Sequence, residues 1–389
     1  MLDFTLSEEQ LAIQRLVREF ADKEIRPVAS QFERDEEGQL AEEIFRKAAR
    51  IGMLGLPVPR DYGGSEAFNV ECSLALEELA VGCGGIATAI GASWFGQTPI
   101  MMAATQEQRQ RWFPTFASTE ETNLCCMAMT EPQGGSDIEN PYMESRTIRT
   151  RVRIEGERLI VNGHKLWPSN SDNSYLYTVV ATTDPNLGDI GSCIVVVPRN
   201  APGLSFGKPY RKMGMDADRN GDIFFDNVEV PLDHLLGKVR DGARILQRAL
   251  IYDRTGAGAI SVGMARGAYE IALNYAKERV VTARPMIQNP ITSAMFGDMA
   301  TAIDAARLLV LRSAWFNAQR GQANIGWATM AKVYASDVAM KVTTDCVQLM
   351  GSYGYSEEVG VEKYIRDAKI IQIYIGANKL TRQVNGETL

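Results

Sequence analysis

The spacing of hydrophobic residues changes twice along this chain of 389 residues. Over about the first 120 residues, apolar side chains recur at intervals of three and four, which is typical of amphipathic helices. Between Leu124 and Pro231 they fall in short alternating runs separated by turn residues such as Glu155-Gly156, which is typical of strands. From about Asp241 to the end the helical spacing returns, in long segments. This order of helical, β and helical segments is the strongest constraint on the fold.

The order predicts a fold of the α+β class. We expect an N-terminal helical domain over residues 1–121, a central antiparallel β sandwich or barrel over residues 122–234, and a C-terminal four-helix bundle over residues 235–389. One helix of the first domain is expected to run from about Thr98 to Phe116. Another should begin at Ser7, because serine followed by a glutamine three residues later is the pattern of a capping box.

Composition limits the classes of function. The net charge of −7 disfavours general binding to nucleic acid or to an anionic membrane surface. No apolar run reaches the roughly 18 residues that a membrane span needs. No basic segment leads into an apolar run at the start, so we expect a cytoplasmic protein. The six cysteines lack the paired spacing of a metal site, and only two histidines are present, so we expect reduced thiols and no metal.

Four motifs occur in the order found in one enzyme family. Residues 129–137 read MTEPQGGSD, residues 162–170 read NGHKLWPSN, residues 348–354 read QLMGSYG, and residues 364–376 read YIRDAKIIQIYIG. They resemble, in turn, the TEPGAGSD run, the NGxKxWITN run, the QxxGGxG run and the RDAK segment with its IYEG-like turn of the FAD-dependent acyl-CoA dehydrogenase family. The resemblance covers nearly the whole chain. It implies an enzyme that binds FAD and acts on an acyl-CoA thioester.

By this resemblance, the first two motifs supply the flavin site. Trp167 matches the aromatic residue beside the isoalloxazine, and Ser169 matches a threonine whose hydroxyl reaches flavin N5. Ser136 matches a residue that contacts the FAD pyrophosphate or the CoA arm. The alternative for each is a turn hydroxyl or a core indole. The cofactor contacts expected in this part of the chain are Met127, Met129, Thr130, Ser136, Trp167 and Ser169.

The family completes its FAD site across a subunit interface. Arg279 matches an arginine that pairs with the pyrophosphate bound by the partner subunit, a role that suits a bidentate cation. Gln348 and Gly351 match residues near the adenosine end of FAD. The resemblance therefore implies at least a dimer, and commonly a homotetramer.

The residue that usually removes the substrate proton is absent. In most members of the family a glutamate precedes the glycine of the IYEG-like turn and takes the α-proton, whereas this chain has Ile375 there. In isovaleryl- and long-chain-type members the glutamate lies on an earlier helix, before a turn that holds an arginine. Aligning that arginine with Arg254 makes Asp253 the candidate base. The alternative is that Asp253 is a carboxylate paired with a nearby cation.

The resemblance also indicates where the acyl group would lie. Members that desaturate cyclic acyl-CoAs by 1,4-elimination carry an aspartate in the region of Gly91, and a desulfinase branch carries an arginine there. This chain has neither, which counts against both close assignments. Aromatic side chains such as Trp94 and Tyr374 could line a pocket for a bulky or ring-shaped acyl group, or could simply pack in the core. The substrate contacts expected from the alignment are Gly91, Trp94, Ser136, Tyr252, Arg254, Tyr374 and Ile375.

The leading hypothesis is an FAD-dependent acyl-CoA dehydrogenase for a branched, cyclic or already unsaturated acyl group. Asp253 would take the proton, flavin N5 the hydride, and an electron-transfer flavoprotein the electrons. Without the usual base, a lyase such as a desulfinase or a flavin monooxygenase remains an alternative, because neither needs an α-proton base. A binding subunit without turnover is a third hypothesis. The retained pair of Trp167 and Ser169 argues against it, because a scaffold gains nothing from a contact to flavin N5.

Overall fold

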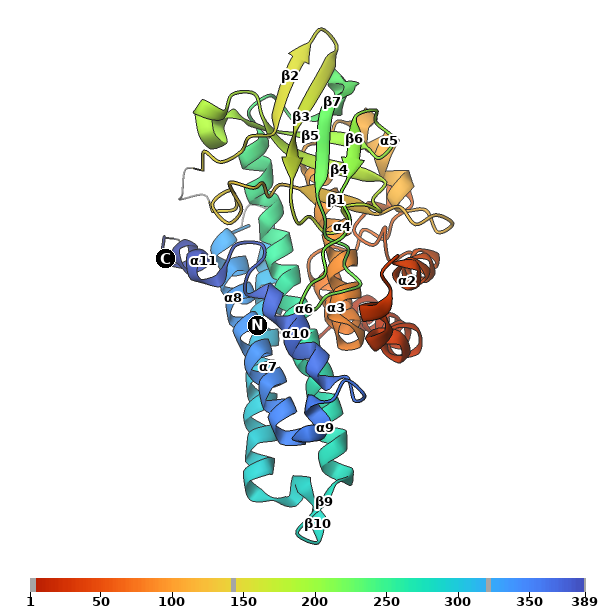
Figure 1. Cartoon of the computed structure of the whole chain (residues 1–389), viewed down its shortest axis with the longest axis vertical. Coiled ribbons are helices and arrows are strands. Elements are labelled where there is room, and N and C mark those ends of the chain that lie inside the picture. The colour runs from red at the N-terminus through yellow and green to blue at the C-terminus, as the bar shows by residue number, and fades with distance from the viewer. Residues whose placement is uncertain (1–4, 141–144, 320–322, 388–389) are drawn as a thin grey trace.

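The computed structural model describes residues 5–140, 145–319 and 323–387. Figure 1 shows an elongated molecule with a β-sheet at one end, N-terminal helices beside its middle, and long C-terminal helices that reach the other end. The α+β class and the order of helical, β and helical parts are therefore confirmed. Among the described residues, no helix combines the length and the hydropathy that a membrane crossing requires.

The N-terminal helices are α1 (Glu8–Phe20), α2 (Gln39–Arg50), α3 (Val70–Gly82), α4 (Gly84–Ala103) and α5 (Gln106–Phe116). The capping box expected at Ser7 is confirmed, because its Oγ accepts a hydrogen bond from the Gln10 backbone N–H at 3.2 Å. The expected helix from Thr98 to Phe116 is wrong: the chain breaks after α4, and Thr105 caps α5. Because α4 is buried on nearly all sides, its apolar sequence carries no helical periodicity that would mark its bounds.

The central part is an eight-stranded sheet in the order β6-β7-β3-β2-β4-β5-β8, with β1 paired to β4 off this path. The sheet is mixed rather than purely antiparallel as expected, because β1 and β2 both run parallel to β4. β1 packs against α4, where a Cβ on Gly96 would come within 2.9 Å of Cys125. The strands are β1 (Cys125–Ala128), β2 (Arg151–Glu155), β3 (Arg158–Lys165), β4 (Leu176–Thr182), β5 (Ser192–Pro198), β6 (Leu204–Phe206), β7 (Ile223–Pro231) and β8 (Leu235–Leu236).

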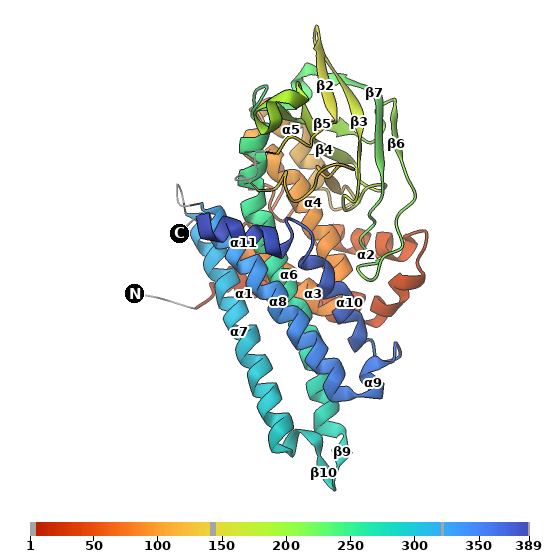
Figure 2. The same ribbon diagram turned by 60° about the vertical axis from the view of Figure 1, so that its left-hand side comes forward.

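In the C-terminal part, α6 runs from the sheet to a small hairpin at the far end of the molecule, and α7 and α8 run beside it (Figure 2). Close contacts of α6 depend on glycine: a Cβ on Gly263 would lie 2.1 Å from the carbonyl oxygen of Glu77 on α3. The elements are α6 (Gly242–Glu278), β9 (Val280–Val281), β10 (Arg284–Pro285), α7 (Pro290–Ala318), α8 (Ile325–Met350), α9 (Ser352–Tyr355), α10 (Val361–Ile371) and α11 (Asn378–Glu387).

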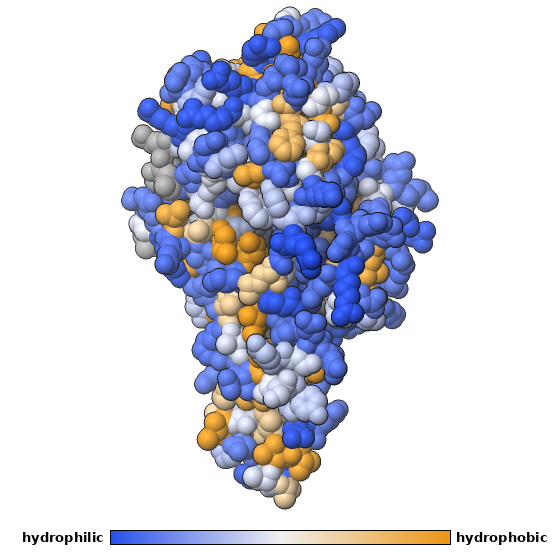
Figure 3. Space-filling view, in the orientation of Figure 1, coloured by the Kyte–Doolittle hydropathy of each residue, from blue (hydrophilic) through white to orange (hydrophobic). Residues whose placement is uncertain are grey.

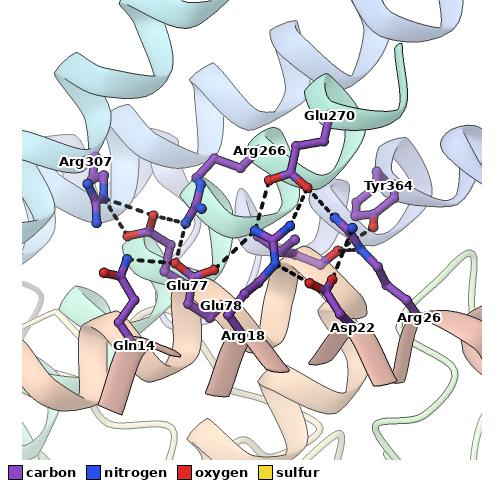
Figure 4. A network of polar contacts seen from close by, with 11 residues as sticks. Gln14, Arg18, Asp22, Arg26, Glu77, Glu78, Arg266, Glu270, Arg307 and Tyr364 are labelled. Carbon is purple, nitrogen blue, oxygen red and sulfur yellow. Dashed lines mark hydrogen bonds and ion pairs between the residues drawn. The ribbon is translucent and has the colours of Figure 1, made fainter. Parts of the chain in front are cut away.

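A polar network fastens the N-terminal helices to the long helices (Figure 4). Glu77 and Glu78 of α3 are buried, and Arg266 of α6 donates to both. Arg18 of α1 donates to Glu270 of α6 at 2.8 Å. Removing one partner from a buried ion pair leaves an uncompensated charge, so each member of this network depends on the others. The network therefore fixes α3 against α6, and these two helices form walls of the cavity described below.

Gly263→Ala tests how closely α3 and α6 pack. We expect it to lower the free energy of unfolding by roughly 1–3 kcal/mol, because the added methyl group would overlap the Glu77 carbonyl. Gly297→Ala is the matched control, since no atom lies within 4 Å of a Cβ at this exposed position of α7. That control should raise stability by about 0.5–1 kcal/mol. Urea unfolding monitored by circular dichroism measures both variants, and similar values for the two would contradict the packing described.

Candidate active site

One large cavity opens where the three parts of the chain meet. Its volume is about 630 Å³, within the range of ligand pockets. Its walls come from α3, α4, β1 with the loop after it, the loop after β3, the loop before β7, α6, α10, and the turn between α10 and α11. The residues expected at the site that line this cavity are Gly91, Trp94, Met127, Met129, Thr130, Ser136, Trp167, Ser169, Tyr252, Asp253, Tyr374 and Ile375. Segments far apart in the sequence are thus brought together as the motifs predict.

One wall carries the motif residues expected to meet the flavin. The Trp167 side chain is 51% exposed, stacks at a tilt on Tyr210 with ring centroids 4.1 Å apart, and has a backbone φ of +67°. Such a φ is rare for a bulky residue, and Asn220 holds it by donating to the Trp167 carbonyl at 3.0 Å. Nearby, the Ser169 hydroxyl donates to Asp218 at 2.8 Å. A broad exposed indole at the edge of an apolar cavity offers a flat surface to a flat ring.

These residues fit the isoalloxazine end of FAD. Met127 and Met129 give the wall an apolar face, and Thr130, Ser136 and Ser169 place hydroxyl groups around it. Apolar walls with a few convergent polar groups are the usual features of a cofactor site. Among the described residues, no group of three or more His, Cys, Asp or Glu side chains has the arrangement of a metal site.

The turn after α10 is held in a strained shape. Ile375 has a φ of +51°, which is an outlier for a β-branched residue. Arg254 donates to the Ile375 carbonyl at 3.3 Å, and Lys332 of α8 donates to the Gly376 carbonyl at 2.7 Å. Ser136 accepts from the Ala377 backbone N–H at 3.0 Å. These contacts fix the turn, and the Ile375 side chain forms part of the cavity wall.

Arg254 does not line the cavity, which corrects its expected role as a substrate contact. Its side chain is 0% exposed, and its other N–H groups donate to Thr329 at 2.9 Å and to the Glu139 carbonyl at 2.8 Å. Burial lowers its pKa to about 10. Arg254 therefore links α6, α8, the loop after β1 and the strained turn from behind the cavity wall.

Three residues expected near FAD lie apart from this cavity. Arg279 follows the last residue of α6, Gln348 is in the last turn of α8, and Gly351 follows it. All three are exposed and belong to the end of the molecule opposite the sheet, where Figure 1 shows the β9–β10 hairpin and α9. Within one chain they do not contribute to the cavity. Their predicted role in completing the site from a partner subunit stays a prediction.

The cavity contains the carboxyl group of Asp253, as the alignment predicts, and two others that it did not identify. Asp253 is partly exposed to the cavity, whereas Glu139 and Asp218 are 4% and 3% exposed. One oxygen of each buried acid, Glu139 Oε2 and Asp218 Oδ1, has no hydrogen-bond partner among the described residues. Burial raises the pKa of all three carboxyl groups, that of Glu139 to about 7. Glu139 lies two residues after the first motif, and Asp218 lies in the loop before β7; nothing in the local pattern of either distinguishes it from a solvated loop acid.

Arg254→Met tests the anchoring of the turn. The variant keeps an apolar stem but leaves three buried oxygen acceptors without a donor. We expect the free energy of unfolding to fall by roughly 2–5 kcal/mol, because each unpaired buried acceptor costs about 1–3 kcal/mol. The control is Arg248→Met on the exposed side of the same helix, which should change stability by less than about 0.5 kcal/mol. Equal losses in urea unfolding for the two variants would refute the anchoring role.

Comparisons with known proteins agree with this geometry. The chain matches the N-terminal, middle and C-terminal domain models of acyl-CoA dehydrogenase over residues 7–120, 126–228 and 240–389. It is 37% identical to cyclohex-1-ene-1-carbonyl-CoA dehydrogenase of Geobacter metallireducens, over 99% of this chain and 98% of that protein.

Two solved structures superpose closely. One is a chain from a structure of the electron transferring flavoprotein of Acidaminococcus fermentans, with a TM-score of 0.93 and 35% identity over 99% of both chains. The other is butyryl-CoA dehydrogenase of Megasphaera elsdenii, with a TM-score of 0.92 and 32% identity over 99% of both chains. The chain described here therefore belongs to the acyl-CoA dehydrogenase family of FAD-dependent oxidoreductases.

Proposed function

We propose that this protein dehydrogenates an acyl-CoA thioester with a branched, cyclic or already unsaturated acyl group, and that Asp253 removes the substrate proton. The observation that carries the proposal is the position of Asp253 on the cavity wall with Tyr374 and Ile375, where Ile375 itself can accept no proton. Among the acids that line the cavity, Asp253 is the one partly exposed to it. A proton acceptor must be within reach of its proton before its pKa matters, and this exposure favours Asp253 over the two buried acids.

Different residues of the chain would remove the proton, orient the cofactor and exclude water. Asp253, once ionised, takes a proton from the thioester as a C–H bond breaks. When bound, FAD supplies the acceptor for the hydride that leaves the neighbouring carbon. Trp167 and the hydroxyl groups of Thr130 and Ser169 orient the cofactor at the opposite wall. Tyr252 and the apolar side chains around it exclude water, which strengthens the electrostatic interactions at the reacting carbons.

The shape of the inner cavity supports a bulky acyl group. Its walls include Trp94 of α4 and Tyr252 of α6, whose ring packs on Phe68 at 4.6 Å between centroids. Two glycines let the Leu76 side chain of α3 pack close to α4 and α6, since a Cβ on Gly91 or on Gly256 would meet it at 3.1 or 3.0 Å, and all three residues line the cavity. Wide, aromatic and apolar walls favour a ring or branch over a straight chain. The similarity to a cyclohex-1-ene-1-carbonyl-CoA dehydrogenase supports the same class of substrate.

We also propose that the protein works as an oligomer, with an electron-transfer flavoprotein as its electron acceptor. Large apolar side chains are exposed around the end of the molecule that carries Arg279, Gln348 and Gly351, among them Val280 at 58% and Tyr353 at 58%. Figure 3 shows hydrophobic surface at this lower end. This apolar surface lies beside three residues that are predicted to contact FAD but do not reach the cavity of their own chain. Burial of the surface against a second copy of the chain is therefore favoured. The match to a chain from an electron transferring flavoprotein structure supports the electron acceptor.

Asp253→Asn tests the base. Mixed anaerobically with a panel of branched, cyclic and straight-chain acyl-CoAs, the wild-type holoenzyme should bleach the flavin absorption band, fastest with a cyclic or branched thioester. The variant should bind FAD with unchanged stoichiometry but react at least about 10²-fold more slowly, which is the usual loss when a positioned general base is removed. Retained activity would exclude Asp253 as the base. Sulfite release or rapid oxygen consumption by the wild type would favour a desulfinase or a monooxygenase instead.

Gly91→Leu tests the shape of the acyl pocket. The new side chain would crowd Leu76 and extend into the cavity that both residues line, because even a Cβ at this position lies 3.1 Å from Leu76. We expect kcat/KM for a cyclic acyl-CoA to fall by roughly tenfold or more, while activity on butyryl-CoA is retained, since such discrimination is typical of small changes in apolar pockets. Steady-state kinetics with both thioesters measures the ratio. An unchanged ratio with normal FAD content would show that the acyl group lies elsewhere.

A further inference from the structure

The Ser169 hydroxyl is hydrogen-bonded to a buried carboxyl group, that of Asp218. The hydroxyl donates to Asp218 Oδ2 at 2.8 Å, and both residues line the cavity. Ser169 belongs to the loop after β3, and Asp218 belongs to the loop before β7. The Asp218 side chain is 3% exposed, and its other oxygen, Oδ1, has no hydrogen-bond partner among the described residues. Few donors therefore reach this carboxyl group, and the Ser169 hydroxyl is one of them.

Backbone contacts hold the two groups together. Ser169 and Asn220 form an isolated antiparallel β-bridge, which joins the two loops. Asn220 Nδ2 donates to the Trp167 carbonyl at 3.0 Å. The backbone N–H of Asp218 donates to the Met215 carbonyl at 2.9 Å. Because both loops are held by their main chains, the hydroxyl stays within hydrogen-bond distance of the carboxyl group.

A neighbouring cation favours the ionised form of this carboxyl group. Lys212 Nζ donates to the backbone carbonyl of Asp218. Burial raises the pKa of Asp218, whereas the Lys212 charge and the Ser169 hydroxyl limit the rise. An ionised carboxylate accepts hydrogen bonds and donates none, so the hydrogen in this contact comes from Ser169. Charge-assisted hydrogen bonds of this kind are stronger than neutral ones.

The contact determines what Ser169 can offer to a ligand. A serine hydroxyl has one hydrogen to donate and two lone pairs that accept. When Asp218 holds the hydrogen, Ser169 Oγ can accept a hydrogen bond from a ligand but cannot donate one. The amide of Asn220 donates to Oγ only at 3.4 Å, which is longer than an ordinary hydrogen bond, so the acceptor capacity is largely free. The ligand atom that suits this position therefore carries a hydrogen.

We propose that Asp218 is a positioning residue that makes Ser169 a hydrogen-bond acceptor toward the flavin, and that it thereby favours the reduced form of bound FAD. This inference rests on the proposed placement of FAD against Trp167 and Ser169. Flavin N5 carries no hydrogen in the oxidised form and one hydrogen in the reduced form. An acceptor beside N5 therefore stabilises the reduced form, whereas a donor would stabilise the oxidised form.

A double-mutant cycle on the midpoint potential of bound FAD separates this role from a direct effect of the Asp218 charge. Ser169→Ala in the otherwise wild-type holoenzyme should lower the ratio of reduced to oxidised FAD about tenfold, or by about 30 mV for a two-electron couple. With Asp218→Asn present, no carboxylate holds the Ser169 hydrogen. Ser169→Ala should then change the ratio less than about twofold, or in the opposite direction. Titration against redox dyes measures all four proteins.

Equal effects of Ser169→Ala in the two backgrounds would overturn the proposal, because a charge that acts on the flavin directly needs no hydroxyl. Asp216→Asn is the matched control. It removes a carboxyl group from the same loop, two residues earlier, that does not line the cavity. Ser169→Ala should keep its full effect in that background. A loss of the effect there would also contradict the proposal, since any charge of the loop would then be sufficient.

A second measurement needs no Asp218 variant. With FAD isotopically labelled at N5, the magnetic resonance signal of N5 in the oxidised holoenzyme should be the same in the wild type and in Ser169→Ala, because Ser169 donates nothing to it. The signal of the reduced holoenzyme should differ between the two. A difference in the oxidised form would show that Ser169 donates to the flavin, and would overturn the proposal.

These outcomes are distinct from those that test the base. If Asp253→Asn abolishes bleaching but Ser169→Ala has equal effects with and without Asp218, this inference fails and the proposed function stands. If Ser169→Ala changes neither the potential nor the N5 signal, FAD does not lie against Ser169, and this inference fails together with that placement. Retained activity of Asp253→Asn would exclude the proposed base without altering the result of the cycle.

Discussion

Two buried cations, Arg254 and Lys332, hold the backbone of the turn around which the cavity is organised. They donate to the carbonyl oxygens of Ile375 and Gly376, the two residues that carry positive φ angles there. A strained backbone of this kind costs about 1–3 kcal/mol, and a hydrogen bond from a charged donor contributes roughly 1.5–3 kcal/mol. The contacts can thus offset the strain. Because they act on main-chain oxygens, these contacts do not depend on the side chain at position 375.

This separation of backbone support from side-chain chemistry explains how the family fold tolerates isoleucine at that position. The anchor is on α6 and α8, and the candidate base is the residue beside the anchor on α6. Trp167, which also lines the cavity, is held in the same way, because its left-handed backbone is fixed through its carbonyl by Asn220. These two parts of the cavity wall are therefore set by main-chain contacts.

Much of this arrangement could be predicted from the sequence. The change from helical to alternating spacing gives the order of the three parts, and the motif residues from Met127 to Ser169 do line one cavity with Asp253 and Ile375. The parallel pairing of β1 was missed because alternation shows a strand but not the direction of its neighbour. Arg254 was misplaced, and Glu139 was missed, because their partners lie more than a hundred residues away in the chain. Local patterns carry no information about such contacts.

The absence of side chains at Gly91 and Gly256 has a consequence for how the substrate preference of this enzyme could change in evolution. Both glycines face the side chain of Leu76, which belongs to α3 and carries no titratable group. One aliphatic residue therefore packs against two helices and lines the cavity between them. Exchanging it for alanine or phenylalanine would change the size of the cavity between these helices, while Asp253 and the residues around Trp167 would stay as they are. Selection for a new substrate would then act on α3, and selection for the rate of the reaction would act on α6.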